Sequence, residues 1–127
     1  MDAHATVKNY FDALAAGDAP RLIEMMSSAS YYVKIGTDAG EFVEGSENAA
    51  DYYKHLVACA ADFTIALEHL DVQERGNVAW FYTRQVWRLT WQGVFEELSM
   101  RMTGVLEREQ GSWRFVQIHA SVGCAPE

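Results

Sequence analysis

The sequence predicts an α+β fold in which three helices of the N-terminal half pack on one face of a strongly bent antiparallel sheet. The first half contains segments whose apolar residues recur at spacings of three and four, the pattern of helices with one buried side. After Asp62 the chain consists of long runs rich in β-branched and aromatic residues, separated by short turns. Strands joined by such short turns are antiparallel neighbours. With 127 residues, the chain is expected to form a single domain, residues 1–127.

Each predicted helix has a start or stop signal in the sequence. The first helix covers residues 2–16, and Gly17 ends it. Its apolar stripe consists of Val7, Tyr10, Phe11 and Leu14. Asp18 is expected to cap a short second helix. Ser46 is expected to cap the third helix, with Glu47 favourably placed near the positive end of the helix dipole.

Six strands are predicted. Two short strands enclose a turn at residues 36–40 and precede the third helix. The long strands follow that helix and are joined by turns that contain glycine. The predicted strand ranges are 31–35, 41–44, 63–74, 78–90, 94–109 and 113–121.

The terminal strand, residues 113–121, has two faces that could both be buried. One parity begins with Trp113 and Phe115 and continues with Gln117 and His119, whereas the other parity is mostly aliphatic. A buried face that changes from aromatic to polar is typical of a strand that forms the wall of a pocket. We therefore expect Gln117 and His119 to face a cavity.

The charge and composition exclude several classes of function. The net charge is −8, which argues against binding to nucleic acid or to an anionic membrane surface. No segment has the pattern of a secretory signal, and no apolar run approaches the length of a membrane span. A soluble cytoplasmic protein is expected, with Cys59 and Cys124 as reduced thiols.

The motifs with strong sequence signals are missing. The nine glycines form neither a GxGxxG nor a P-loop spacing, and the sequence has no GxSxG motif. The four histidines and two cysteines are not spaced as metal ligands. Neither a metal site nor a cofactor is therefore expected.

Polar side chains among the aromatic residues remain as candidates. Arg101 and Thr103 share one parity of the penultimate strand, and Arg101 meets His119 over one concavity if the parities of the two strands match. Arg101 is then either an anchor for an anion or carbonyl group or half of a structural salt bridge, with Glu24 or Asp51 as its partner. His119 is either an acid or base near neutral pH or a core histidine satisfied by hydrogen bonds.

The aromatic residues also have two interpretations. Tyr10, Tyr31 and Tyr53 either offer hydroxyl groups to a pocket or are core aromatics with one hydrogen bond each. Trp80 and Trp87 fit sheet packing or a dimer face better than ligand stacking.

Three parts of the chain carry a family resemblance. They are residues 7–18 (VKNYFDALAAGD), the Gly45-Ser46-Glu47 entry to the third helix, and a closing hairpin that combines Arg101-Met-Thr103 with residues 111–121. This combination, which spans nearly the whole chain, resembles the SnoaL-like branch of the nuclear transport factor 2-like superfamily. The resemblance implies a cystatin-like, cone-shaped α+β barrel with a deep pocket. It also implies a homodimer formed through the outer face of the sheet.

The active-site patterns of the superfamily are matched only in part. Tyr10 falls where steroid isomerases place the tyrosine of their oxyanion hole, but Lys34 takes the position of their base aspartate. Where SnoaL-type cyclases carry an acid/base aspartate, the terminal strand offers Gln117 and His119. The same hairpin also resembles the association domain of calcium/calmodulin-dependent kinase II, which assembles rather than catalyses.

The sequence therefore predicts a protein that binds a small apolar molecule with one carbonyl or carboxylate group. The residues expected to line its pocket are Tyr10, Leu14, Tyr31, Tyr53, Arg101, Thr103, Phe115, Gln117 and His119. One alternative is an isomerase, polyketide cyclase or dehydratase with His119 as acid/base and Tyr10 as a second catalytic residue. The other alternative is an association module without catalysis.

Overall fold

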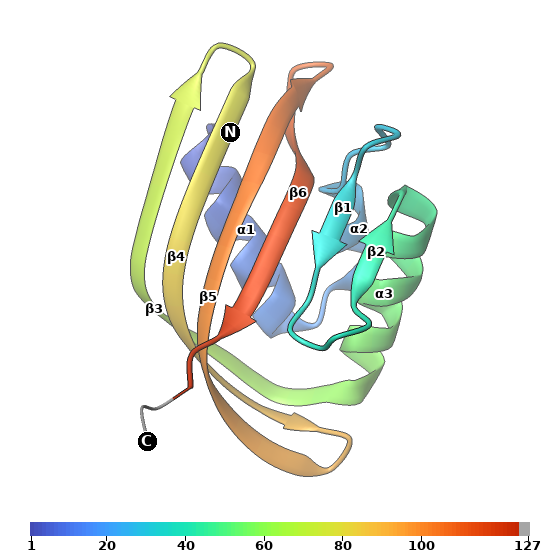
Figure 1. Ribbon diagram of the computed structural model, residues 1–127, viewed down its shortest axis with the longest axis vertical. Coiled ribbons are helices and arrows are strands. Elements are labelled where there is room, and N and C mark those ends of the chain that lie inside the picture. Colours follow the sequence, from blue (N-terminus) through green and yellow to red (C-terminus); the bar gives the residue numbers. More distant parts are fainter. Residues whose placement is uncertain (125–127) are drawn as a thin grey trace.

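The computed structural model describes residues 1–124 and confirms the α+β fold class, with three helices and a six-stranded curved sheet (Figure 1). The helices are α1 (Ala3–Ala16), α2 (Ala19–Glu24) and α3 (Ser46–Cys59). The strands are β1 (Val33–Ile35), β2 (Phe42–Glu44), β3 (Ala60–Arg75), β4 (Val78–Trp91), β5 (Val94–Glu109) and β6 (Ser112–Val122). The strand order is β2-β1-β6-β5-β4-β3, so the last strand of the chain lies in the middle of the sheet.

One strand pair differs from the predicted antiparallel sheet, because β1 runs parallel to β6. The segment after α2 lies beside β6 before β1 begins: Phe115 N–H donates to the carbonyl of Met25, and Ser27 N–H donates to the carbonyl of Phe115. The chain therefore enters β1 already running in the direction of β6. No short turn joins these two strands, so the rule for hairpins does not apply to them.

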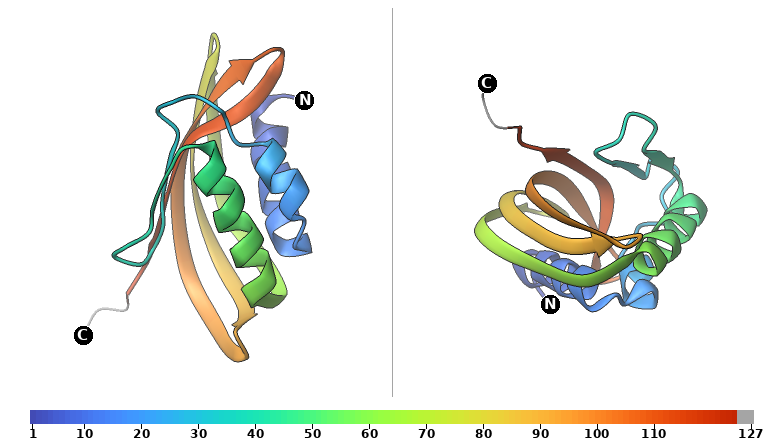
Figure 2. Two further views of the ribbon diagram at one scale, coloured as in Figure 1. Left: turned by 90° about the vertical axis from the view of Figure 1, so that its right-hand side faces the viewer. Right: turned by 90° about the horizontal axis from the view of Figure 1, so that it is seen from below.

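The helices cover one face of the sheet and leave the other face open (Figure 2). Asp2 caps α1 by accepting a hydrogen bond from Ala5 N–H, and Gly17 ends it with a left-handed φ of 69°. The predicted cap of α3 is wrong by one residue. Gly45, with a φ of 83°, is the N-cap and makes no side-chain hydrogen bond, whereas Ser46 is the first helical residue.

A β-bulge in β6 decides which residues of this strand face the helices. Val105 of β5 pairs with Gln117 and Leu106 pairs with Phe115, so Val116 is an extra residue. Before the bulge, Trp113 and Phe115 are buried; after it, the buried residues are Ile118 and Ala120. Gln117 and His119 are consequently turned to the open face. The prediction that they share the face of Phe115 is wrong, because it assumed uninterrupted alternation along the strand.

The core between α1, α3 and the sheet is aromatic. Tyr10, Tyr53 and Phe115 are each at most 1% exposed. The hydroxyl groups of Tyr10 and Tyr53 lie 2.7 Å apart and form a hydrogen bond, which satisfies both groups away from water. The ring centroids of Tyr10 and Phe115 are 4.9 Å apart. This cluster fills the barrel at the level of the bulge.

Gly104 in β5 provides the space for one of these core rings. A Cβ atom at this position would lie 2.4 Å from Cε1 of Phe81 and 2.9 Å from the carbonyl oxygen of Gln117. Both distances are shorter than van der Waals contact, and the carbonyl belongs to the neighbouring strand. Glycine is therefore required here by the close approach of a ring and a backbone.

We predict that Gly104→Ala lowers the free energy of unfolding by about 1–3 kcal/mol, the usual effect of overpacking a core. Urea unfolding followed by circular dichroism measures the change. Gly40→Ala is the matched control, because a Cβ at Gly40 meets no atom within 4 Å. Equal stabilities of the two variants would contradict the packing role of Gly104.

Candidate functional site

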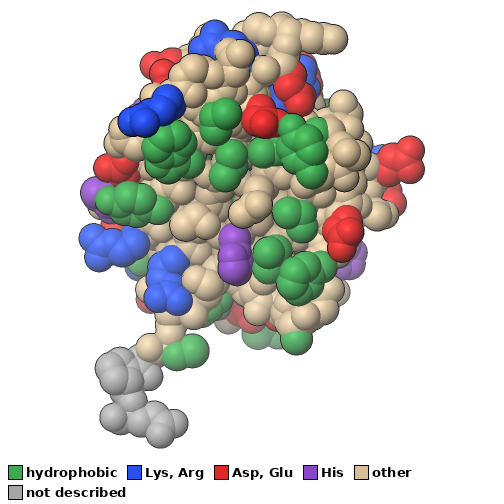
Figure 3. Space-filling view, turned by 45° about the horizontal axis from the view of Figure 1, so that its top comes forward, with side chains coloured by type: hydrophobic (Ala, Val, Ile, Leu, Met, Phe, Trp, Pro, Cys, Tyr) green, Lys and Arg blue, Asp and Glu red, His purple; other side chains and the backbone are tan. Residues whose placement is uncertain are grey.

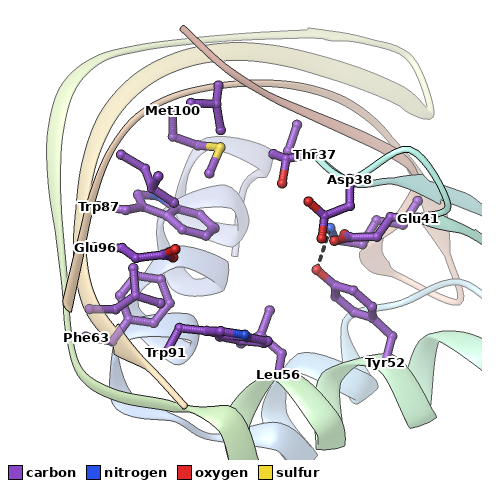
Figure 4. A pocket seen from close by; sticks show the side chains of 16 residues that line it. Thr37, Asp38, Glu41, Tyr52, Leu56, Phe63, Trp87, Trp91, Glu96 and Met100 are labelled. Atoms are coloured by element: carbon purple, nitrogen blue, oxygen red, sulfur yellow. Dashed lines mark hydrogen bonds between the residues drawn. The ribbon is translucent and has the colours of Figure 1, made fainter. Parts of the chain in front are cut away.

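A cavity of about 360 Å³ opens between the β1–β2 hairpin, α3 and the ends of β3, β4, β5 and β6 that lie near the C-terminus of α3 (Figure 4). Two sides of this cavity differ in chemistry. Strands β3, β4 and β5 supply mostly aromatic and aliphatic side chains, whereas the hairpin and α3 supply an amine, carboxylates and a phenol. A mostly apolar cavity with a few convergent polar groups is the usual form of a small-molecule site.

The apolar wall is centred on Trp87 of β4. Its ring packs edge-on against Phe63, with centroids 4.9 Å apart, and its Nε1–H donates to Gln85 Oε1 at 2.6 Å. Gln85 is fully buried next to Trp87 on the same face of β4, so this hydrogen bond holds the indole in place. Trp91 continues the wall, because residues 87 and 91 of the strand point to the same face.

The polar side is centred on Lys34 of β1. This side chain is only 4% exposed, and its Nζ donates to Tyr52 Oη at 3.1 Å (the dashed line in Figure 4). Nζ also lies 4.4 Å from the centroid of the Tyr52 ring. Among residues 1–124 the only salt bridge joins Arg88 to Glu97, so no carboxylate is paired with the Lys34 amine.

Two acidic residues of the hairpin, Asp38 and Glu41, also line the cavity near Tyr52 (Figure 4). The side chain of Glu41 folds back over Gly36, where a Cβ atom would lie 1.7 Å from the carboxylate oxygen Oε2. Gly36 thus leaves the space that lets Glu41 reach the cavity. Glu96 of β5 adds a third carboxylate, on the aromatic side.

Burial shifts the protonation of the polar groups. Desolvation lowers the pKa of Lys34 to about 8, although the charge of Glu41 opposes the shift. Desolvation, together with a hydrogen bond to Asp38, raises the pKa of Glu41. Burial also raises the pKa of Tyr52, which therefore stays protonated and able to donate a hydrogen bond. The site holds an amine that is unusually easy to deprotonate beside a phenol that is hard to deprotonate.

None of the nine residues predicted to line a pocket lines this cavity. Tyr10, Leu14, Tyr53 and Phe115 belong to the buried core. Tyr31 is 61% exposed and donates its hydroxyl hydrogen to Glu107. These five residues therefore lie apart from the cavity, on the core side of the bulge or at the surface.

The other four, Arg101, Thr103, Gln117 and His119, are brought together on the open face. Thr103 pairs directly with His119, and Val105 with Gln117. Arg101 Nε donates to Ser121 Oγ at 3.2 Å, so neither Glu24 nor Asp51 is its partner. Arg101 and His119 thus lie on one face of the sheet, which was the condition for their meeting, but this face is the open one and not the cavity.

The sequence did not identify the residues that line the cavity as pocket residues. In the sequence, Lys34 was notable because it takes the position of the base aspartate of steroid isomerases. It also lies between Val33 and Ile35, so its side chain points to the opposite face of the strand from those two apolar residues. Tyr52 carried no distinguishing signal. Trp87 was assigned to sheet packing or a dimer face, but it lines the cavity; Trp80, two-fifths exposed, lies on the open face.

Several further features of residues 1–124 bear on the chemistry. No three His, Cys, Asp or Glu side chains of this region lie close enough together to hold a metal ion. Cys59 and Cys124 are free thiols rather than a disulfide. No helix in the described part of the chain has the length and apolar character needed to cross a membrane.

The pKa of Lys34 predicts a pH-dependent stability. Below about pH 8 the folded state buries a cation; between about pH 8 and pH 10.5 the folded amine is neutral while the unfolded amine remains protonated. The unfolded state binds the additional proton, so stability rises with pH across this window. We predict that Lys34→Met is more stable than the wild type near neutral pH by at most about 3 kcal/mol, and that this advantage shrinks as the pH rises to about 9.5.

Urea unfolding of both proteins at the two pH values measures this effect. Lys54→Met serves as the control, because Lys54 is exposed on α3. A difference between Lys34→Met and the wild type that is independent of pH would contradict a buried, titrating amine.

Comparisons with known proteins agree with the architecture. The SnoaL-like domain matches residues 3–125. A candidate dehydratase of the nuclear transport factor 2-like family from Streptomyces avermitilis is 16% identical, with a TM-score of 0.85 over 96% of this chain and 94% of that one. A ketosteroid isomerase-like protein from Erwinia carotovora is 18% identical, with a TM-score of 0.79 over 96% and 94%.

A candidate calcium/calmodulin-dependent protein kinase II association domain from Xanthomonas campestris is also similar, with 19% identity and a TM-score of 0.78 over 94% of this chain and 84% of that one. A sequence search of curated proteins gave no match. The three structures share the fold at low identity, and the domain match covers almost the full length. The chain therefore belongs to the SnoaL-like domain family.

Proposed function

We propose that the protein binds a small, mostly apolar molecule in the cavity and anchors one oxygen of that molecule at Lys34 and Tyr52. The observation that carries this proposal is the amine of Lys34, which is buried at the edge of an aromatic cavity and forms no salt bridge with any carboxylate of residues 1–124. A buried lysine is costly unless it has a task or a partner. A volume of about 360 Å³ lies within the usual range of small-molecule sites.

The charges around the cavity favour a neutral carbonyl group over a carboxylate. Asp38, Glu41 and Glu96 line the same cavity as the single amine of Lys34. A ligand carboxylate would be repelled by whichever of these acids are ionised. A carbonyl oxygen, in contrast, accepts hydrogen bonds from the amine and the phenol and adds no charge.

The names of two similar structures fit a small-molecule role. A dehydratase and a ketosteroid isomerase both act on small organic molecules that bear oxygen. The catalytic role considered for His119 receives no support from the geometry, because this ring lies on the opposite face of β6 from the cavity. Any chemistry inside the cavity would fall to Lys34, Tyr52 and the acids of the hairpin.

Three naphthalene probes of similar size test the anchor. We predict that 2-acetylnaphthalene binds about tenfold more tightly than 2-ethylnaphthalene, which lacks the oxygen, because a hydrogen bond to a buried charged donor contributes on the order of 1.4 kcal/mol. The carboxylate 2-naphthoate is expected to bind more weakly than the ketone. Isothermal titration calorimetry gives the three dissociation constants.

Lys34→Met should remove most of the advantage of the ketone over 2-ethylnaphthalene and leave only the contribution of Tyr52, whereas Lys54→Met should leave both affinities unchanged. Failure of all three probes to bind the wild type would refute the proposed site. Tightest binding of 2-naphthoate would refute the preference for a neutral carbonyl.

We also propose that two copies of the chain associate through the open face of the sheet. Trp80 and Tyr82 lie two residues apart on the same face of β4 and are 40% and 51% exposed. Trp80 pairs with Val105 of β5, and Tyr82 pairs with Thr103. Figure 3 shows hydrophobic side chains lying among polar ones on this side of the molecule. Large exposed aromatic residues are typical of interfaces. The likeness to a candidate association domain supports assembly of some kind.

Analytical ultracentrifugation is expected to give twice the chain mass of 14.3 kDa for the wild type and a single chain mass for Trp80→Glu. A buried carboxylate without a partner opposes association. Phe95→Glu is the control: Phe95 is 65% exposed but lies ten residues along β5 from Val105, about 33 Å away in an extended strand. A monomeric wild type would overturn this proposal.

A further inference from the structure

The surroundings of the Lys34 nitrogen suit a reactive amine. Buried lysines with a structural role usually form a salt bridge, but within residues 1–124 this amine donates its hydrogen bond to the neutral hydroxyl of Tyr52, 3.1 Å away, and Glu41 acts on it only at longer range. Lys34 is one of the residues that line the cavity, so a molecule bound there lies beside its side chain. With a pKa of about 8, roughly one amine in ten is neutral at pH 7, against fewer than one in a thousand for an ordinary lysine.

We propose that Lys34 forms an imine with an aldehyde or ketone held in the cavity, an inference that rests on the proposed binding function. The lone pair of Nζ attacks the carbonyl carbon, a C–N bond forms, and the carbonyl oxygen takes up a proton to give a carbinolamine. The C–O bond then breaks, water leaves with the proton lost from nitrogen, and a C=N bond remains. No oxidant or reductant takes part, and water is the only product released.

Tyr52 is positioned to assist both steps. In its hydrogen bond with Lys34 the phenol oxygen is the acceptor, so the phenol hydrogen is free to be donated to another group. The carbonyl oxygen of a molecule attacked by Nζ would lie close to this hydroxyl. Because burial raises the pKa of Tyr52, the group remains a donor and does not compete as a base.

The hairpin acids supply the remaining proton transfer. Dehydration of a carbinolamine requires an acid that protonates the departing oxygen. Glu41 lines the same cavity, and burial raises the pKa of its carboxyl group, so the protonated form persists closer to neutral pH than for an exposed glutamate. Amine, phenol and carboxyl group thus lie in one wall, and the opposite aromatic wall holds the apolar body of the ligand.

Reductive trapping tests the proposal. The wild type is incubated with 2-naphthaldehyde and sodium cyanoborohydride near pH 7, and the adduct is located by peptide mass spectrometry. The chain has only three lysines, Lys8, Lys34 and Lys54, and the exposed Lys8 and Lys54 are internal references. We expect Lys34 to be modified at least about tenfold faster than either, with a gain equal to the aldehyde less its oxygen atom.

Variants separate chemistry from binding. Lys34→Arg keeps the charge but cannot form the imine and should lose the fast adduct, whereas Tyr52→Phe should slow adduct formation without a matching loss of affinity for 2-ethylnaphthalene. Excess 2-ethylnaphthalene should protect Lys34 but not Lys54. If the naphthalene probes bind but Lys34 is trapped no faster than Lys54, the imine is refuted while the binding site stands. If the probes do not bind and Lys34 is not trapped, both proposals fail.

Discussion

The extra residue in β6 is the constraint on which the rest of the molecule depends. Val116 has no partner of its own on β5, and its insertion reverses which residues of the strand face the helices. Phe115 therefore packs against Tyr10 in the core between the helices and the sheet, while Ala120 and Val122 form part of the cavity wall. The short side chain of Ala120 leaves room that a histidine or glutamine at the same place would fill. The bulge at Val116 thus places Phe115 in the core and Ala120 in the wall of the cavity.

The cavity then contains one group that stability alone does not explain. A methionine in place of Lys34 would fill similar space and bury no charge, so the amine lowers the stability of the fold near neutral pH. Tyr52 satisfies one hydrogen on the amine but cannot neutralise it. Groups that are kept in the native state at a cost to stability, and that face a cavity, are typical of functional sites. Burial thus identifies Lys34 more directly than any sequence motif does.

The sequence predicted the three helices, the four long strands and their turns, because these depend on local periodicity and on glycine at turns. It assigned the wrong face to Gln117 and His119, because alternation along a strand holds only while the pairing is uninterrupted, and nothing in the residues around Val116 announces the bulge. The cavity was harder still to predict. Lys34 lies in a strand of three residues, and Trp87 has the parity of a core position, so their meeting depends on how the sheet curves. Such long-range geometry has no local signature.

The protonation states in the cavity are linked through burial. Desolvation favours neutral Lys34 and protonated Glu41, whereas their mutual attraction favours the charged forms of both. A neutral ligand that expels water from this side of the cavity strengthens desolvation, so binding itself would increase the share of nucleophilic amine and of protonated acid. An anionic ligand would act in the opposite sense, because its charge stabilises the lysine cation. In the proposed site, repulsion by the acids would disfavour an anionic ligand, and desolvation by a neutral one would favour the uncharged amine that can react with a carbonyl group.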